Sequence, residues 1–394
     1  MTPDEVAAVG RLAGEAGAGV AVHVQRVHRA VAGRVFRLLR PVATPVERVH
    51  DVVAGIAYVT VRTGLRGAGV AGGRALRCAT PAGAPPLATS GAGAVAQAVL
   101  NGFIGAGLTA RDDPLAIRMA LREGGRDVAP TATDLAAAYP TATSHVVVFV
   151  HGLTGDDRSW RGRFSARLAA DADCTPVHLR YSSGRSIADN GAALSDLLTA
   201  VVRAWPVPVD RLSIVGHSMG GLVARAACAA GTADDAPWLP VLSELVSLGT
   251  PHGGARLARI AGIAGRALRA VPEAAPWAAY VDHSPGIRDL QRGLDVPGVP
   301  TARQHVVSAT LAGLPGRLLG DLLVDPRSAC ACDHVEVVAL EGFSHIDLLT
   351  HPEVYDAIRP WLTADPRAPG VAEPGHQRVA SPSAARTGAS SCSS

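Results

Sequence analysis

The sequence is poor in aromatic residues and in cysteine, and each shortage narrows what the chain can be. Phe, Trp and Tyr make up 4% of its 394 residues, so a core must be built mainly from Ala, Val and Leu. Six dispersed cysteines are too few for a disulfide framework, and no group of Cys and His has the spacing of a zinc site. We therefore expect neither a disulfide scaffold nor a metal, and no cofactor.

The sequence also lacks lysine and any large excess of charge. All 37 strongly basic residues are arginine, and 34 acidic residues leave a formal net charge of +3, too small to attract nucleic acid over the whole surface. The first residues, Met-Thr-Pro-Asp-Glu, are acidic where a secretory signal is basic. The uncharged stretch 78–110 is broken by prolines and glycines, which favours a loop and a short helix over a membrane span. We expect a cytoplasmic protein without a nucleic-acid partner.

Three regions differ in texture. Residues 1–140 are rich in Arg, Ala and Gly and have a helical pattern, whereas 365–394 lack apolar periodicity and predict a disordered tail. Between them, in 141–364, short β-branched runs alternate with helix-length segments; the runs are 146–150, 177–181, 212–215, 245–248, 305–308 and 335–339. This alternation predicts an α/β domain with a mostly parallel sheet and helices on both faces. Residues 253–299 lengthen one connection after a strand, where ligands bind in such sheets, and predict a helical lid.

A candidate nucleophile stands at the junction of a strand and a helix. The run Gly216-His-Ser218-Met-Gly220 follows a β-branched segment directly and precedes a helix-forming one. A sharp turn there exposes the serine hydroxyl above the sheet, at the positive end of the helix. We therefore expect Ser218 to be the nucleophile of an acyl-transfer reaction.

Such a reaction needs donors for the negative charge that develops on the carbonyl oxygen. The strand 146–150 runs into His151-Gly-Leu153-Thr-Gly155, a glycine-flanked loop that can direct backbone N–H groups at the serine. We assign the backbone amides of Leu153 and Met219 as the oxyanion donors. His151, at the strand end, is expected to have a structural hydrogen-bonding role.

The general base and its acid should follow the serine in the chain. His345 comes after the last strand-like run and a flexible Glu-Gly-Phe-Ser stretch, so it can lie over the serine, while His252 is the rival base. The acid that orients the base is left open among Asp321, Asp325 and Asp333, which all lie between the strand at His305 and His345; Asp321, in a loop opened by Gly320, fits best and Asp325 is the runner-up.

These residues resemble the lipase and esterase branch of the α/β-hydrolases, including bacterial lipases and lipases of the inositol-deacylase type. The stretches that carry the resemblance are Val-Phe-Val-His-Gly-Leu at 148–153, Gly-His-Ser-Met-Gly-Gly-Leu-Val-Ala-Arg at 216–225, Leu-Gly-Thr-Pro-His-Gly-Gly at 248–254 and Ser-His-Ile-Asp-Leu-Leu-Thr-His-Pro at 344–352. It implies the α/β-hydrolase fold and a catalytic triad.

The resemblance also bears on the acid. In that family an Asp-Gly-Leu-Val motif followed by Ser-Ala carries it, and the matching stretch here is Asp321-Leu-Leu-Val324 with Ser328-Ala329, so Asp321 is implied over Asp325. Leu322 replaces the usual glycine. Tyr181-Ser-Ser-Gly-Arg185 and Asn190 resemble a substrate-side loop of related hydrolases, although a plain strand-to-helix connection explains them equally well.

The N-terminal region contains a basic amphipathic helix. Val24, Val27, Val31, Val35 and Leu38 recur at helical spacing, with arginines on the opposite face, and Pro41 and Pro45 precede a second helix. We expect a helical hairpin packed on the hydrolase with its arginines in water. The alternative is peripheral contact of the basic helix with an anionic membrane.

Together the motifs predict a serine hydrolase that cleaves carboxylic esters, with lipid-like esters as its substrates, through an acyl-enzyme on Ser218. An acyltransferase or a thioesterase would use the same triad of Ser218, Asp321 and His345. A non-catalytic lipid- or partner-binding protein that docks through the arginine-rich helix is the hypothesis from a different class.

Overall fold

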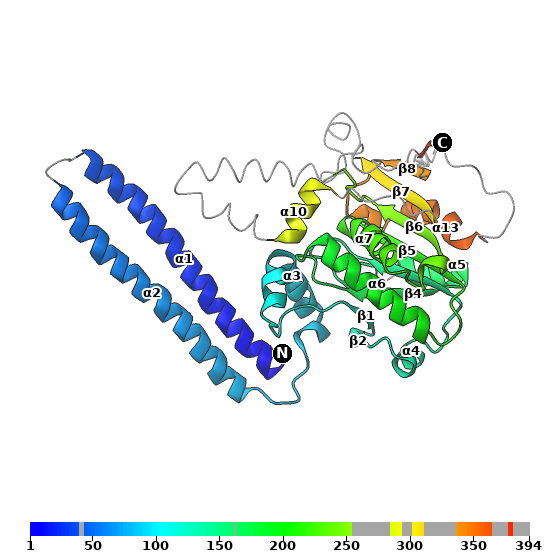
Figure 1. Cartoon of the computed structure of the whole chain (residues 1–394), viewed down its shortest axis with the longest axis horizontal. Coiled ribbons are helices and arrows are strands. Elements are labelled where there is room, and N and C mark those ends of the chain that lie inside the picture. Colours follow the sequence, from blue (N-terminus) through cyan, green and yellow to red (C-terminus); the bar gives the residue numbers. More distant parts are fainter. Residues whose placement is uncertain are drawn as a thin grey trace, which may run out of the picture.

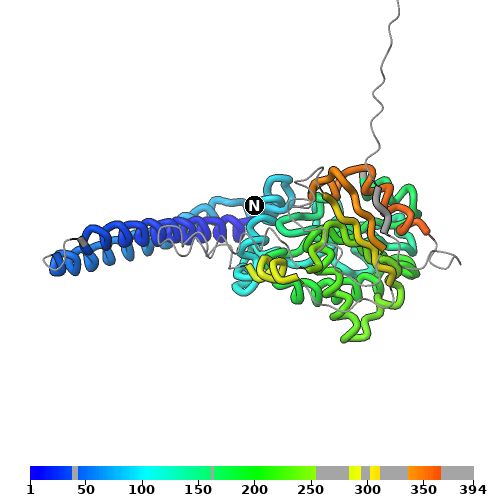
Figure 2. Tube along the Cα trace, turned by 90° about the horizontal axis from the view of Figure 1, so that it is seen from above, coloured from blue at the N-terminus to red at the C-terminus, as the bar shows by residue number. Residues whose placement is uncertain are grey.

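The computed structural model of the chain describes residues 1–38, 43–160, 163–253, 284–293, 302–310, 336–364 and 377–380. A body built on one β-sheet carries a long two-helix hairpin that projects from it (Figures 1 and 2). The N-terminus lies at the base of this hairpin, beside the body (Figure 1). The expected N-terminal helical extension is therefore present.

Among the described residues, nine strands form one sheet in the order β2-β1-β4-β3-β5-β6-β7-β8-β9. They are β1 (Ala120–Glu123), β2 (Arg126–Val128), β3 (His145–Val150), β4 (Thr175–Arg180), β5 (Arg211–His217), β6 (Leu242–Leu248), β7 (Arg303–Thr310), β8 (Glu336–Glu341) and β9 (Gln377–Ala380). β1 runs antiparallel to β2 and β4, and every other pair is parallel. The expected α/β fold with a mostly parallel sheet is confirmed.

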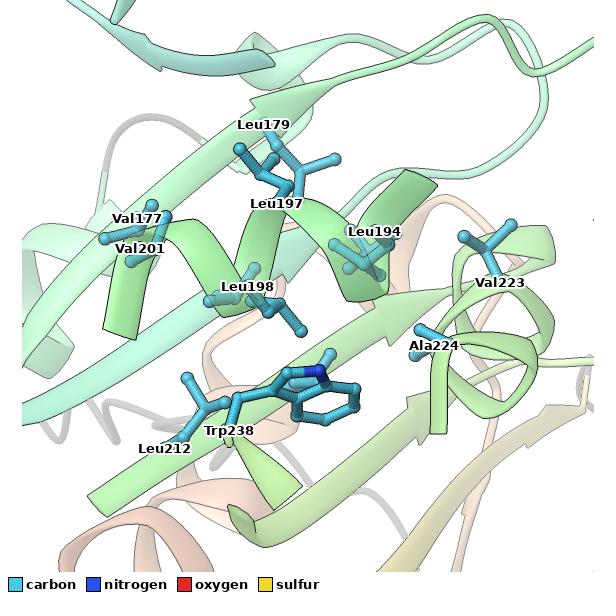
Figure 3. Close-up of a cluster of buried hydrophobic side chains, with 14 of the residues drawn as sticks. Val177, Leu179, Leu194, Leu197, Leu198, Val201, Leu212, Val223, Ala224 and Trp238 are labelled. Carbon is cyan, nitrogen blue, oxygen red and sulfur yellow. The ribbon is translucent and has the colours of Figure 1, made fainter. Parts of the chain in front are cut away.

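Helices cover both faces of this sheet, as expected. On one face, α6 (Ile187–Ala204) and α7 (Met219–Ala233) bury leucines and valines against the strands, with Leu194, Leu198 and Trp238 at the centre (Figure 3). On the other face, α5 (Arg163–Ala172) and α13 (Pro352–Thr363) pack on a second cluster that contains Phe149 and Val215. Side chains of β3 alternate between the two clusters, which is why all its residues are buried. All of them except His145 are apolar.

The remaining helices among the described residues are shorter or lie outside these layers. They are α1 (Pro3–Leu38), α2 (Thr44–Ala79), η1 (Leu87–Thr89), α3 (Gly91–Ala110), α4 (Ala132–Ala138), η2 (Asp157–Trp160), η3 (Leu239–Val241), α10 (Pro285–Arg292) and η4 (Asp347–Leu349).

The sheet extends beyond the segment expected to contain it. β1 and β2 precede residue 141 and form a hairpin whose turn is Gly124-Gly125, both with positive φ, so the N-terminal 140 residues are not wholly helical. The two-glycine turn is the signal that sequence reasoning missed. In the expected disordered tail, 365–394, the segment Gln377–Ala380 pairs with β8; the rest of that tail lies outside the described residues.

The expected lid, 253–299, lies largely outside the described residues. Within it, Ser284 caps α10, and its hydroxyl donates to the carbonyl oxygens of Gly102 and Gly184 at 3.0 and 3.2 Å. This part of the segment is therefore fastened to α3 and to the loop after β4. Whether the segment acts as a lid stays a prediction.

The uncharged stretch 78–110 contains a longer helix than expected. Among the described residues, α3 is the one helix whose length and mean hydropathy reach the range of a membrane span. However, Gln97 and Asn101 on α3 are buried, and their side-chain amides donate to the backbone carbonyl of Leu115, with Asn101 also accepting from Ile117. These contacts make α3 a packed helix of the body.

The two helices of the hairpin, α1 and α2, contact each other through small residues. Ideal Cβ atoms placed at Gly10 and Gly14 of α1 would lie 2.5 and 2.7 Å from backbone atoms of α2, so only glycine permits this approach. Further along α1, Ala18, Ala21 and Gln25 are buried in the same seam, at spacings of three and four residues. The helices were expected, but the seam uses the glycine and alanine row and not the valine row.

The hairpin also contacts the body differently from our expectation. Ala8 and Leu12 near its base pack with Leu108 and Leu115, and Arg11 pairs with Asp113. The distal part projects away from the sheet (Figure 2). The hairpin therefore packs on the body at its base but not over its distal part, and its arginines are largely in water as expected.

Candidate active site

The candidate nucleophile sits in a strained turn between β5 and α7. Ser218 has φ 55° and ψ −124°, a conformation that L-residues rarely adopt and that costs about 1–3 kcal/mol. Its amide donates to the carbonyl oxygen of Leu248 at the end of β6, at 2.8 Å. The elbow is thus held from the neighbouring strand, and the serine stays half-buried at the N-terminus of α7.

Two glycines make this turn possible. An ideal Cβ at Gly216 would lie 2.5 Å from the amide nitrogen of Gly221, and one at Gly220 would collide with the carbonyl oxygens of Val150 and His151. Both positions therefore exclude a side chain. They explain the glycine pattern on either side of the serine.

The strand order places this elbow at a switch point of the sheet. β3 lies between β4 and β5, so the chain turns to opposite sides after β3 and after β4. In open α/β sheets, ligands bind beside the carboxyl ends of the strands at such a point. The loops after β3 and β5, which contain Gly152 and Ser218, lie there together: a Cβ at Gly152 would be 3.0 Å from the Ser218 Cβ.

His345 lies on the loop that follows β8 and is buried. Asp347 shapes this loop, because its Oδ2 accepts hydrogen bonds from the amide and the hydroxyl of Ser344 at 2.8 and 2.7 Å. These two bonds lower the pKa of Asp347. Because its carboxylate is committed to Ser344, Asp347 acts as a loop-forming residue.

His217 connects the elbow to the His345 loop. Its Nε2 lies 3.0 Å from the backbone oxygen of His345, so Nε2–H donates to that oxygen. The centroids of the His217 and His345 rings are 4.6 Å apart. Burial, reinforced by the neighbouring His345, lowers the pKa of His217 to about 3. His217 is therefore a neutral donor that joins two segments 128 residues apart. Sequence reasoning gave it no role, although it stands beside the nucleophile.

The His345 imidazole packs over the backbone that holds the nucleophile. A Cβ at Gly249 would lie 3.1 Å from both Nδ1 and Cε1 of His345, and Gly249 follows directly on the Leu248 carbonyl that accepts the Ser218 amide. Gly249 has φ 58°, in the left-handed region that favours glycine. The structure thus brings Ser218, His345 and the loop of Gly152 into one small region.

The loop after β3 contains Leu153, whose backbone amide was predicted to be an oxyanion donor. The carbonyl oxygen of Gly152 accepts from the Nδ1–H of His151 at 2.9 Å and from the amide of Gly155 at 3.1 Å. Because C=O and N–H point in opposite directions across a trans peptide, the Leu153 N–H points away from these two donors. Leu153 itself is half-buried, and Met219 is the first residue of α7, where backbone N–H groups are not used within the helix.

His151 is fully engaged in supporting that loop. Its Nε2 accepts the Tyr181 amide at 3.3 Å, its backbone oxygen accepts the Tyr181 hydroxyl at 2.6 Å, and the two rings stack. Burial lowers the pKa of His151. With both ring nitrogens occupied, His151 has the structural role expected of it.

The loop after β4 supports the same region, a role that the sequence did not reveal. Ser183 Oγ accepts the amide of Thr154 at 3.0 Å, where Thr154 has φ 58°. The Gly184 amide in turn donates to the Asn101 carbonyl on α3. Asn190 Nδ2 donates to the carbonyl of Ser182 at 3.0 Å, so it fixes this loop from α6.

The rival base, His252, lies beside a cation. Its Nδ1 is 3.2 Å from Nη1 of Arg225, and since a guanidinium only donates, Nδ1 must be the acceptor. Burial, and then Arg225, lower the pKa of His252 to about 3. A histidine held neutral beside arginine is a poor proton acceptor, which favours His345 as the base. The two candidates for the acid, Asp321 and Asp325, lie outside the described residues.

Comparison with known proteins agrees with this geometry. Residues 140–266 match a family model described as "Putative serine esterase (DUF676)". No curated protein matches the sequence.

Solved structures give weaker likenesses. The lipase BlEst2 of Bacillus licheniformis in mature form is 20% identical, with 55% of this chain and 91% of that one covered and a TM-score of 0.43. The same lipase in its propeptide form is 19% identical, with 58% of this chain and 51% of that one covered and a TM-score of 0.42. This chain therefore spans about half of that longer protein. Phospholipase PlaB from Legionella pneumophila is 15% identical, with 57% of this chain and 60% of that one covered and a TM-score of 0.40. At such identities these structures say nothing of this chain's substrate.

The strand order is that of the α/β-hydrolase fold, and the strained serine between β5 and α7 is placed as in a nucleophile elbow. The family match covers the same segment. The described residues have the α/β-hydrolase fold, and residues 140–266 match the family described as a putative serine esterase.

Proposed function

We propose that this protein hydrolyses carboxylic esters through an acyl-enzyme on Ser218. The observation that carries the proposal is the backbone of Ser218, which is held at φ 55° in the turn from β5 to α7 by its neighbours on β6. Strain of this kind persists only where the surrounding structure enforces it, and it is concentrated at functional sites. An ordinary serine in a turn would have no need of it.

In the first half of the reaction, His345 takes the proton from the Ser218 hydroxyl while Oγ bonds to the ester carbonyl carbon. The negative charge that forms on the carbonyl oxygen is stabilised by the backbone amides of Leu153 and Met219. As the C–O bond to the alcohol breaks, His345 returns its proton to the leaving oxygen. Ser218 is then acylated.

In the second half, water takes the place of the alcohol. His345 removes a proton from the water, whose oxygen attacks the acyl carbon, and then protonates Ser218 as the carboxylic acid departs. Asp321 orients the imidazole and stabilises its charged form, with Asp325 as the alternative acid. Water and these side chains account for every proton that moves.

We propose lipid-like esters as the substrate class, supported by the stretches that the chain shares with lipases. A panel of p-nitrophenyl esters of increasing acyl length tests this choice. We expect kcat/KM to rise from acetyl to medium-chain esters, because a longer chain can bury more apolar surface. A constant or falling series would contradict the lipid-like substrate while leaving the esterase intact.

The nucleophile is tested by covalent labelling. We expect a fluorophosphonate to modify Ser218 in the folded wild-type protein, and pre-steady-state hydrolysis of an activated ester to show a burst equal to the labelled fraction. Ser218→Ala should lose both, and Ser195→Ala, on the adjacent helix α6, is the matched control that should keep them. Absence of labelling in folded wild-type protein would refute the proposal.

Two further comparisons separate the alternatives. Added alcohols or thiols should not raise the rate of product release if water is the natural acceptor, whereas an acyltransferase would form the corresponding ester or thioester. Asp321→Asn should reduce kcat far more than Asp325→Asn, since only the acid of the triad fixes the tautomer of the base. The opposite order would assign the acid to Asp325.

A further inference from the structure

The distal part of the hairpin carries a large exposed apolar surface. Among the described residues, most large apolar side chains that face solvent lie here, and eleven of them, each 50–64% exposed, form what we call the apolar surface of the hairpin: Val20, Val24, Val31, Val35, Val46, Val49, Val52, Val53, Ile56, Val59 and Val61. Single exposed valines are normal on proteins, but eleven large apolar side chains exposed on one projecting element indicate an interaction site.

These side chains are not needed for the contact between α1 and α2. The two helices meet through the seam of Gly10, Gly14, Ala18 and Ala21, where backbone approaches backbone. On α2, the residues 46, 49, 52, 53 and 56 fall on one side of the helix, while buried Ala54 lies on another. The hairpin is therefore internally complete, and its valines serve no packing role in its own seam.

The same part of the chain is strongly basic. Residues 20–61, which carry the apolar surface, contain six arginines and only two acidic residues, Glu47 and Asp51, which gives a formal charge of 6 − 2 = +4 on a chain whose total is +3. Five of these arginines have side chains that the structure describes as exposed: Arg26, Arg29, Arg34, Arg37 and Arg48. The surface is thus both apolar and cationic.

We propose that the hairpin docks on an anionic lipid surface. A bilayer interface accommodates both properties, because valine side chains enter the boundary of headgroups and acyl chains while arginines reach back to the phosphates. A second copy of the chain would place two segments of charge +4 side by side. A nucleic acid would pair with the arginines but leave the valines in water. Charge and apolar exposure together thus favour the lipid surface.

This docking does not rest on the proposed esterase activity. The hairpin contacts the body near its base, through Ala8 and Leu12, and its apolar surface begins at Val20. Loss of membrane binding should therefore leave hydrolysis of a small water-soluble ester unchanged. The two proposals can fail separately.

The test is flotation of the full-length protein with vesicles of phosphatidylcholine, with or without phosphatidylglycerol. We expect binding to the anionic vesicles only, weakened by added salt. Val49→Asp combined with Ile56→Asp should abolish it, whereas Val95→Asp should not, because Val95 is 53% exposed but lies on α3. Arg48→Gln should weaken binding about fivefold, the equivalent of about 1 kcal/mol for one arginine near an anionic surface.

Circular dichroism at 222 nm must show equal helicity in all variants, and hydrolysis of p-nitrophenyl acetate must be equal in those of the hairpin. The proposal is overturned if wild-type protein does not bind anionic vesicles, or if the Val49 and Ile56 double variant binds as well as wild type. A wild-type dimer in sedimentation velocity that the double variant loses, without vesicle binding, would assign the surface to a second copy. Binding to duplex DNA without binding to vesicles would assign it to nucleic acid.

Discussion

Replacement of His217 by phenylalanine tests whether its hydrogen bond to the backbone oxygen of His345 is needed for the proposed hydrolysis. Phenylalanine keeps the aromatic ring against His345 but removes the N–H that donates to the His345 backbone oxygen at 3.0 Å. That oxygen then remains buried without this donor. The unmet acceptor should lower the free energy of unfolding by about 1–3 kcal/mol. A domain with an ordinary stability of about 5–15 kcal/mol stays folded under that loss.

The effect on activity should be larger than the effect on stability. His345 must stay within hydrogen-bonding distance of Ser218, and a displacement of about 1 Å in a catalytic group can reduce the rate by about 100-fold. We therefore expect kcat of His217→Phe to fall by about 10- to 100-fold with KM nearly unchanged, because only the positioning of the base is altered. Steady-state hydrolysis of p-nitrophenyl butyrate measures both, and urea unfolding measures stability.

His217→Gln is the matched control. The glutamine amide can place an N–H near the position of Nε2, so kcat should recover most of its wild-type value. Since burial holds the pKa of His217 at about 3, the side chain is neutral at working pH, and neither substitution removes a charge. A His217→Phe variant with wild-type kcat would refute the reasoning. A glutamine variant as inactive as phenylalanine would show that ring packing matters and the hydrogen bond does not.

Three further substitutions probe the support of the site. Gly152→Ala should lower kcat by at least about tenfold and stability by about 1–3 kcal/mol, because its methyl would lie 3.0 Å from the nucleophile's Cβ; labelling kinetics and urea unfolding report each. Ser183→Ala removes the acceptor of an oxyanion-loop amide and should reduce kcat about tenfold, whereas Ser182→Ala should not, since its hydroxyl has no hydrogen-bond partner among the described residues. The folded pKa of His145, about 3, is below its unfolded value of 6.5, so the unfolded state binds more protons between them and stability falls as pH drops from 6.5. His145→Gln should reduce this slope by about 1.4 kcal/mol per pH unit, measured by urea unfolding at several pH values.

The parts of the fold that the sequence predicted are those with strong local signals. Six strands of the sheet lie where β-branched runs alternate with helical segments, because both faces of those strands are buried. β1 and β2 were missed, since both are short, β2 lies at the edge of the sheet, and their polar residues, such as Arg122 and Asp127, pair with each other. In the sequence, only Gly124-Gly125 indicates the turn between these two strands.

The supporting contacts of the site could not be predicted in the same way. The hydrogen bond from His217 to His345 spans 128 residues, and that from Thr154 to Ser183 spans 29. Periodicity reports which face of an element is apolar, but not which loops meet at the end of a sheet. The acid, whether Asp321 or Asp325, stays a prediction.

The hairpin shows how a periodic pattern can be correct and its interpretation wrong. The valines of α1 do recur at helical spacing, and we expected them to be covered by the hydrolase. The buried row is instead made of Gly10, Gly14, Ala18 and Ala21, which also recurs at spacings of three and four. Small residues carry little hydrophobicity, so their row is faint in the sequence, yet they allow the closest approach of two helices.

Helix α3 shows that the N-terminal third cannot be treated as an appendage of the hydrolase. At one end its Leu108 packs with Ala8 and Leu12 of the hairpin base. Further along, the carbonyl of Gly102 accepts the Ser284 hydroxyl, and a Cβ at Gly102 would press on the methyl group of Thr154 in the oxyanion loop. A boundary drawn at residue 141 would remove this helix together with β1 and β2, and with them the wall behind that loop. The folded body therefore begins before the segment that matches the putative serine esterase family, while the hairpin is joined to it at its base.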